Sequence, residues 1–153
     1  MPKPGRISWS ARPIHVSDFE PTLDLVENLI LPVWAWAILE LSAAILCTLG
    51  WAGRMDGWFD KGSASLWFSS IALIPAVMTL VVFGCQFELG YDAWIPTSMF
   101  LFLMNPFMLL FSLFALLLPP RSPGTASTLF ARVLVVLCVL ESWAYTVRYF
   151  PTA

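Results

Sequence analysis

Four long apolar runs, separated by short polar segments, constrain the fold of this chain more than any other feature. They cover about residues 33–51, 65–87, 94–118 and 127–148. An apolar run of about 18 or more residues can cross the ~30 Å hydrocarbon core of a bilayer as a helix. Of the 153 residues, 59% are hydrophobic and only 12% are charged, whereas soluble domains have about 25% charged residues. The sequence therefore predicts an all-α integral membrane protein, a bundle of four transmembrane helices.

Tryptophan residues lie at the edges of these runs, where aromatic side chains favour the membrane–water interface. Trp34, Trp36 and Trp51 bracket the first run, and Trp67 and Trp94 open the next two. The segments between the runs are rich in glycine, proline, aspartate and serine, which is typical of turns. The aromatic residues therefore support the same four spans.

The residues before the first span form an extramembrane leader, 1–32, ahead of a transmembrane domain, 33–153. The end of the leader, SDFEPTLDLVENLI, has apolar and acidic residues on different helical sides. The apolar side consists of Leu23, Val26 and Ile30. This pattern indicates either a short amphipathic interfacial helix before Pro32 or an extension of the first span.

The distribution of lysine and arginine predicts the orientation in the membrane. Loops 52–64 and 119–126 carry Arg54, Lys61 and Arg121, and Arg132 is close enough to extend to the same face. The opposite face has Arg148 alone close to a span. We therefore predict that both loops are cytoplasmic and that both termini lie on the opposite side.

Polar side chains inside the spans are the candidate functional groups, because a charge in the middle of a membrane helix costs about 2.5–3.5 kcal/mol. Glu40, Asn105 and Glu141 lie deepest. Since consecutive spans alternate in direction, both carboxylates are displaced toward the same face at comparable depth. Tyr145 and Arg148 share the helical side of Glu141 and are its candidate partners. These five residues form the predicted set of intramembrane polar contacts.

Small residues at a spacing of four would allow two helices to approach closely. The sequence has two such sets. They are Ala44/Thr48/Ala52 and Ala72/Ala76. The third span differs, because phenylalanine, methionine and leucine surround it on nearly every side, so it is expected to face lipid or a foreign apolar surface.

Two prolines, Pro75 and Pro106, lie in the middle of spans, where each removes a backbone hydrogen bond. Neighbouring hydroxyl and amide side chains can bind backbone groups that a proline leaves free. We expect Ser69, Ser70 and Asn105 to do so here.

The sequence has no signature of catalysis or metal binding. Cys47, Cys85 and Cys138 lie inside predicted spans without CxxC spacing, so they are expected to pack as small apolar residues. His15 is the only histidine, which leaves no Ser–His or Cys–His pair in the membrane and no bis-histidine haem. We therefore expect no catalytic residues, no metal and no intrinsic cofactor, while a lipid or quinone bound at an interface stays open. The net charge of −2 gives no indication of nucleic-acid binding.

Two functions agree with these features. The first is a non-catalytic structural or accessory subunit of a larger membrane complex, of a respiratory, photosynthetic or transport kind. The second is a small oligomeric transporter or channel for protons or cations that uses Glu40 and Glu141. The partners are accordingly the lipid bilayer and either other membrane subunits or further copies of the same chain.

Overall fold

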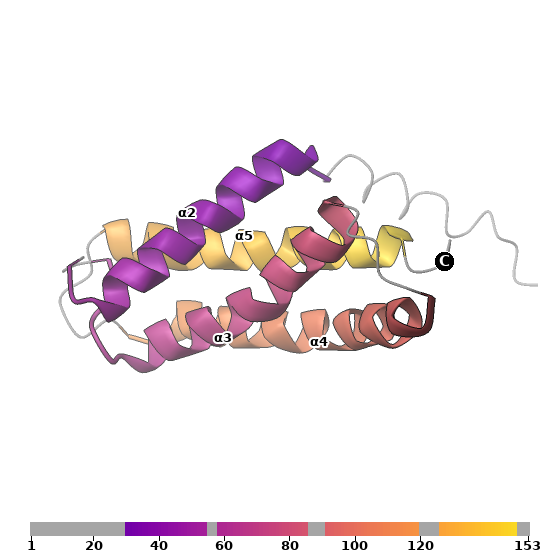
Figure 1. Cartoon of the computed structure of the whole chain (residues 1–153). Coiled ribbons are helices and arrows are strands. Elements are labelled where there is room, and N and C mark those ends of the chain that lie inside the picture. Colours follow the sequence, from indigo (N-terminus) through magenta and orange to yellow (C-terminus); the bar gives the residue numbers. More distant parts are fainter. Residues whose placement is uncertain (1–29, 55–57, 86–90, 120–125, 150–153) are drawn as a thin grey trace, which may run out of the picture.

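A computed structural model describes residues 30–54, 58–85, 91–119 and 126–149, which form four helices (Figure 1). Helix α2 spans Val33–Trp51, and α3 spans Ala64–Thr79 and continues as a π-helical turn, η2, at Leu80–Gly84. Helix α4 spans Tyr91–Leu117, and α5 spans Ala126–Tyr149. Each helix, with α3 and η2 taken together, is long and apolar enough to cross a membrane. The prediction of an all-α membrane bundle with four transmembrane helices is confirmed.

Helix α2 has a defined beginning and a defined end. Pro32 is its N-cap, with φ −61° and ψ 145° in the extended region, and its carbonyl accepts the N–H of Trp36 at 3.1 Å, the first bond of the helix. At the other end Gly53 adopts φ +66°. Its N–H binds the carbonyl of Gly50, and the N–H of Arg54 binds that of Leu49. This is a Schellman motif, in which glycine supplies the left-handed residue that terminates the helix.

Helix α3 begins with a side-chain cap and ends in a wider turn. The hydroxyl of Ser63 accepts the backbone N–H of Leu66 at 3.2 Å, which satisfies one of the free donors at a helix start. Pro75 lies inside the helix, and the hydroxyl of Thr79 donates to its carbonyl at 2.7 Å. Beyond Thr79 the backbone hydrogen bonds join residues five apart, the π-helical pattern. The N–H of Cys85, for example, binds the carbonyl of Leu80.

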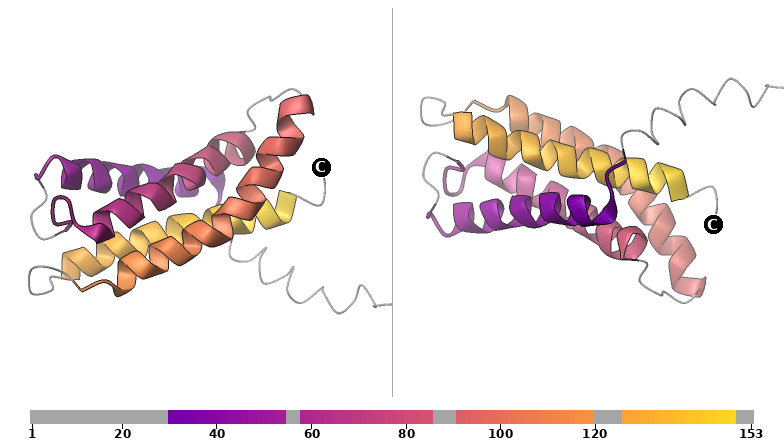
Figure 2. Two further views of the ribbon diagram at one scale, coloured as in Figure 1. Left: turned by 90° about the horizontal axis from the view of Figure 1, so that it is seen from below. Right: turned by 90° about the horizontal axis from the view of Figure 1, so that it is seen from above.

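Helix α4 contains two prolines, Pro96 and Pro106. Its axis bends along its length (Figure 2), as expected where a proline removes a backbone donor. The predicted role of Ser69, Ser70 and Asn105 at the prolines is wrong. The hydroxyl of Ser70 donates to the carbonyl of Leu66, one turn too early. The hydroxyl of Ser69 has no hydrogen-bond partner in the described part of the chain, and the amide of Asn105 donates to side chains of other helices.

Helices α3 and α5 form the centre of the bundle. Each of them contacts all the other helices, whereas α2 and α4, over their described residues, do not contact each other. Over an 18-residue apolar segment of each helix, 28% of the residues of α2 and of α4 are buried, against 50% for α3 with η2 and 56% for α5. Helices α2 and α4 therefore flank the central pair, with the start of α2 and the end of α5 at the same end of the bundle (Figure 1).

The core between the helices is built from small and β-branched side chains. Ala72 and Ala76 of α3 are fully buried, as are Cys138 and Val139 of α5. The predicted contact role of Ala72/Ala76 agrees with this burial. The prediction for Ala44/Thr48/Ala52 is wrong, because Thr48 and Ala52 are exposed. Helix α2 instead buries the adjacent stripe, Ala43, Cys47 and Gly50.

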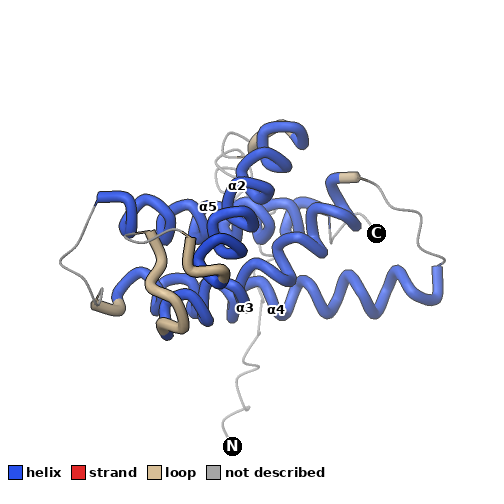
Figure 3. Tube along the Cα trace, turned by 60° about the vertical axis from the view of Figure 1, so that its left-hand side comes forward, coloured by secondary structure: helices blue, strands red, loops and turns tan. Residues whose placement is uncertain are grey.

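The connection between α2 and α3 folds against the end of the bundle (Figure 3). Phe59 in this connection is only 2% exposed and packs into the main core cluster. Its Cβ comes so close to α2 that a Cβ added to Gly50 would lie 2.9 Å from it. Gly50 is therefore required for the close approach of loop and helix.

Three further sequence predictions, on the tryptophans, the cysteines and the interfacial helix, have different outcomes. Trp36 is fully buried, in contrast to Trp34, which is 69% exposed, so Trp36 does not belong to the interfacial belt. Cys85 is exposed, whereas Cys47 and Cys138 are buried and all three are free thiols. The predicted interfacial helix before Pro32 lies outside the described residues, except for its last one, Ile30.

We predict that Gly50→Ala destabilises the protein by about 1–3 kcal/mol, the usual cost of overpacking a tight contact. Alanine favours a helix over glycine by about 1 kcal/mol, so a loss of stability would isolate the clash with Phe59. Thermal unfolding in detergent measures the effect. The control is Ser42→Ala in the same helix, where the side chain binds only the carbonyl of Ile38. An unfolding temperature at or above that of the wild type would contradict the prediction.

Candidate functional site

Glu40 is buried where α2 meets α5. Its side chain is 2% exposed, and Oε1 accepts two hydrogen bonds. The indole Nε1 of Trp36, one turn earlier in α2, donates at 2.8 Å, and the hydroxyl of Ser142 in α5 donates at 3.0 Å. The carboxylate therefore connects two helices, in an environment where an unpaired carboxylate is costly.

Trp36 and Tyr145 extend this contact toward the start of α2. Their rings stack with centroids 4.2 Å apart and planes inclined by 23°. The hydroxyl of Tyr145 donates to the carbonyl of Leu31 at 2.8 Å, and the carboxylate of Glu141 accepts the backbone N–H of Leu31. Helix α5 thus holds both backbone polar groups of Leu31, where residues 30–32 lead from α2 across α5 (Figure 2). We call this arrangement the Leu31 clamp.

Asn105 of α4 forms a second polar junction, which joins α3, α4 and α5. It is fully buried, and its amide Nδ2 donates to the hydroxyls of Thr79 at 3.2 Å and Thr146 at 2.8 Å. Those hydroxyls donate in turn to carbonyls of their own helices, at Pro75 and Ser142. Each hydroxyl is therefore both donor and acceptor, with its proton and one of its two lone pairs engaged.

Ser142 and Thr146, one turn apart on α5, join the two junctions into one network. It runs from Glu40 in α2, through α5, to Asn105 in α4 and Thr79 in α3. All four helices therefore contribute a side chain to it. Contacts of this kind between membrane helices are worth about 0.6 kcal/mol on average and up to about 1.7.

Two buried oxygens in this network have no hydrogen-bond partner among the described residues. They are Oε2 of Glu40 and Oδ1 of Asn105. A buried acceptor without a donor costs about 1–3 kcal/mol. Both atoms could accept a hydrogen bond from a proton donor such as a water molecule, or contact a cation.

Charged residues elsewhere take other roles. Arg132, buried at 5% exposure, donates to the carbonyl of Leu118 at the end of α4, where a cation favourably meets the helix dipole. Arg148 is exposed near the end of α5, and its pairing with Glu141 stays a prediction. The hydroxyl of Tyr145 donates to the carbonyl of Leu31, and its contact with Glu141 likewise stays a prediction.

An apolar groove lies beside the Leu31 clamp, between α2 and α5. Its volume is about 440 Å³. The apolar wall consists of Leu31, Leu39, Leu137, Leu140, Ala144 and Val147. Glu141 and Trp143 complete the lining and are its polar members. The groove therefore gives a carboxylate access to the surface that surrounds the bundle.

The structure thus brings together Glu40, Glu141 and Tyr145 along the contact of α2 with α5, and it links Asn105 to them through α5. The sequence interpretation did not identify Ser142, Thr146 or Thr79 as their partners. The signal for two of them was a spacing of four on α5, Cys138–Ser142–Thr146, which places small and hydroxyl side chains on one helical face.

The chain matches no protein-family model, no curated protein and no solved structure. Over the described residues, no three histidine, cysteine, aspartate or glutamate side chains come close enough to hold a metal ion. The chemistry of the site consequently has to be inferred from its hydrogen bonds, its burial and the groove.

We predict that Asn105→Leu destabilises the bundle by about 1–3 kcal/mol, because two interhelical hydrogen bonds are lost. The matched control is Ser112→Ala in the same helix, where the buried hydroxyl binds only the carbonyl of Leu109. Thermal unfolding in detergent, followed by the fraction that stays monodisperse, compares the two variants. Equal stability of Asn105→Leu and Ser112→Ala would refute the role of Asn105 as a junction.

Proposed function

We propose that this protein is a non-catalytic accessory subunit of a larger integral membrane complex. The observation that supports the proposal best is the use of both membrane carboxylates for internal contacts. Glu40 accepts from Trp36 and Ser142, and Glu141 accepts from Leu31. In an accessory subunit, such groups fix the helices in one arrangement that a partner recognises.

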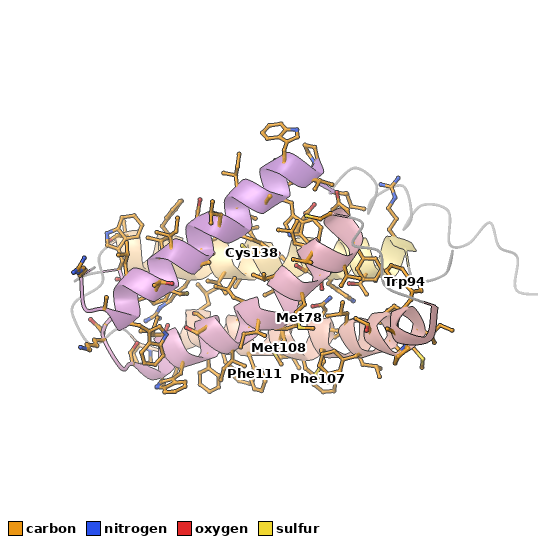
Figure 4. The ribbon with its side chains drawn as sticks, in the orientation of Figure 1. Met78, Trp94, Phe107, Met108, Phe111 and Cys138 are labelled. Carbon is orange, nitrogen blue, oxygen red and sulfur yellow. The ribbon has the colours of Figure 1, made fainter. Side chains whose placement is uncertain are left out.

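The outer side of α4 offers a surface for such a partner. Bulky side chains recur there every three or four residues and are 47–57% exposed. They are Phe100, Leu103, Phe107, Leu110 and Phe114. Phe107 projects away from the bundle, while the adjacent Met108 is buried in it (Figure 4). A continuous ridge of aromatic and aliphatic side chains can pack against another helix, because shape rather than polarity drives helix association in lipid.

A second function, a small oligomeric transporter or channel for protons or cations, is favoured by a different observation. Oε2 of Glu40 and Oδ1 of Asn105 are buried acceptors without a donor in the described residues. Ionisable groups inside a membrane commonly mark ion or proton paths. In this function, Glu40 would bind and release the coupling ion, and Glu141 would serve as the second carboxylate near the same face.

The two functions predict different polypeptides that co-purify with the protein. Extraction in mild detergent and size-exclusion chromatography should give a stoichiometric complex with at least one other membrane polypeptide. A homo-oligomer alone, active in a proton-flux assay in liposomes, would replace the accessory-subunit proposal by the transporter.

Variants of Glu40 make the same distinction within the chain. Glu40→Gln keeps an acceptor for Trp36 and Ser142, so we predict that complex recovery and ion flux are unchanged. Glu40→Leu removes the acceptor and should weaken the bundle by about 1–2 kcal/mol, lowering recovery of the complex. Thr48→Val is the control, because Thr48 is exposed and bonds only within α2. Loss of a flux in Glu40→Gln at full recovery would contradict the structural role.

We further predict that the loops containing Lys61 and Arg121 face the cytoplasm and that both termini face the other side. The test introduces Lys61→Cys and Thr152→Cys separately into a chain whose three native cysteines are replaced by alanine. An impermeant thiol reagent added outside should label the cysteine at 152, and label that at 61 only after the membrane is opened. The reverse pattern would invert the orientation, and labelling of both positions from outside would contradict four spans.

A further inference from the structure

We propose that the groove between the start of α2 and the second half of α5 binds a phospholipid with a primary ammonium headgroup. Its acyl chain would lie along the apolar wall, and its ammonium group would donate to the carboxylate of Glu141. The inference does not depend on the proposed accessory function, because the surface offered there to a partner lies on α4, whereas the groove lies between α2 and α5.

The size and lining of the groove suit an acyl chain. Its volume of about 440 Å³ lies within the range of about 300–1,000 Å³ typical of small-molecule pockets. Leucine, alanine and valine side chains supply nearly all of its lining, including Leu137, Leu140 and Val147. Leu137 and Leu140 are 46% and 39% exposed, so the groove is open to the surrounding lipid along its length.

The depth of Glu141 suits a headgroup. Glu141 lies fifteen residues beyond Ala126, the first residue of α5, which corresponds to about 22 Å at about 1.5 Å per residue. In a hydrocarbon core of about 30 Å, the carboxylate then lies within about 8 Å of the far boundary. An ammonium group at the headgroup level can approach a carboxylate at this depth.

The charge of Glu141 selects the headgroup. The carboxylate lines the groove and is 7% exposed, with the backbone N–H of Leu31 as one donor. A carboxylate in an apolar surrounding is favoured by a nearby cation that also donates hydrogen bonds. A primary ammonium group has three N–H donors, whereas a quinone offers carbonyl acceptors that do not complement a carboxylate.

The same charge disfavours two other occupants of the groove, the preceding segment of this chain and a second copy of the protein. The residues just before Leu31 include Asp24 and Glu27, and their carboxylates would repel that of Glu141. A second copy placed symmetrically on this face would bring a second Glu141 toward the first, since a twofold interface joins identical patches. The ammonium group of a zwitterionic phospholipid brings no second carboxylate toward Glu141.

Binding of defined lipids to the purified full-length protein tests the proposal. The probes are phosphatidylethanolamine, phosphatidylcholine and phosphatidylglycerol with identical acyl chains, added after delipidation and quantified by native mass spectrometry. We expect phosphatidylethanolamine to bind about tenfold more tightly than phosphatidylglycerol, a difference of about 1.4 kcal/mol, and more tightly than phosphatidylcholine, which has no N–H donor. Equal affinity for the three lipids would overturn the proposal.

Two variants separate the headgroup from the groove. Glu141→Gln retains an acceptor for the N–H of Leu31 and should remove the preference for phosphatidylethanolamine. Ala144→Phe fills the groove and leaves the carboxylate in place, so it should abolish binding of all three lipids. The matched control is Ala126→Phe, at an exposed position in the first turn of α5. An unchanged preference in Glu141→Gln, or unchanged binding in Ala144→Phe, would overturn the proposal.

The same samples report the competing occupants. A wild-type dimer that Ala144→Phe converts to a monomer would assign the groove to a second copy. A disulfide formed between cysteines introduced at 144 and 26 in the presence of lipid would assign it to the leader of the chain. Either result would overturn the lipid site.

Discussion

The bonds between α2 and α5 are the interaction on which the rest of this bundle depends. Helix α2 does not contact α4 over the described residues, and its buried stripe is narrow and consists largely of small side chains. Apolar burial alone drives little association between helices in lipid, because lipid is equally apolar. The bond of Glu40 to Ser142, the stacking of Trp36 on Tyr145 and the Leu31 clamp supply the directional contacts that fix α2 on its neighbour.

Polar contacts at the opposite end of the bundle follow the same logic. The indole of Trp51 donates to Ser70, the hydroxyl of Ser65 donates to the carbonyl of Ala115, and Arg132 donates to that of Leu118. The stretch between the two ends is closed largely by alanine, cysteine and valine side chains, together with leucines and Met108. Directional bonds at both ends with close apolar packing between them define one register for each helix, since sliding by a turn would leave buried polar groups unpaired.

The sequence predicted the four helices to within three residues at each end, because apolar length and turn composition are local properties. It also identified Glu40 and Asn105, because the cost of such side chains in lipid is independent of the fold, but not the hydroxyl groups of Thr79, Ser142 and Thr146 that bind them. The sequence prediction was wrong where a neighbouring element determines which face of a helix is buried. Ala44/Thr48/Ala52 and Ala43/Cys47/Gly50 are adjacent stripes of one helix, and the neighbours of α2, among them Phe59 and Leu66 of α3 beside Gly50, select the second. Tryptophan near the end of a span is typical of the membrane interface, but Trp36 is buried in the bundle by its hydrogen bond to Glu40 and its stacking on Tyr145.

The hydroxyl of Ser142 can donate its proton to Glu40 or to one of two backbone carbonyls, and Glu40 is the strongest of these acceptors. This hydroxyl has one proton and three acceptors within 3.4 Å, at Glu40, Cys138 and Ala76. The carbonyl of Ala76 already accepts the N–H of Leu80, and that of Cys138 lies in the helical ladder of α5. Among the described residues, Oε1 of Glu40 accepts only from the indole of Trp36 besides Ser142. A bond to a carboxylate is roughly twice as strong as a neutral one when the carboxylate is ionised. The proton of the Ser142 hydroxyl is therefore best placed on the contact between α2 and α5, where it holds α2 on its neighbour.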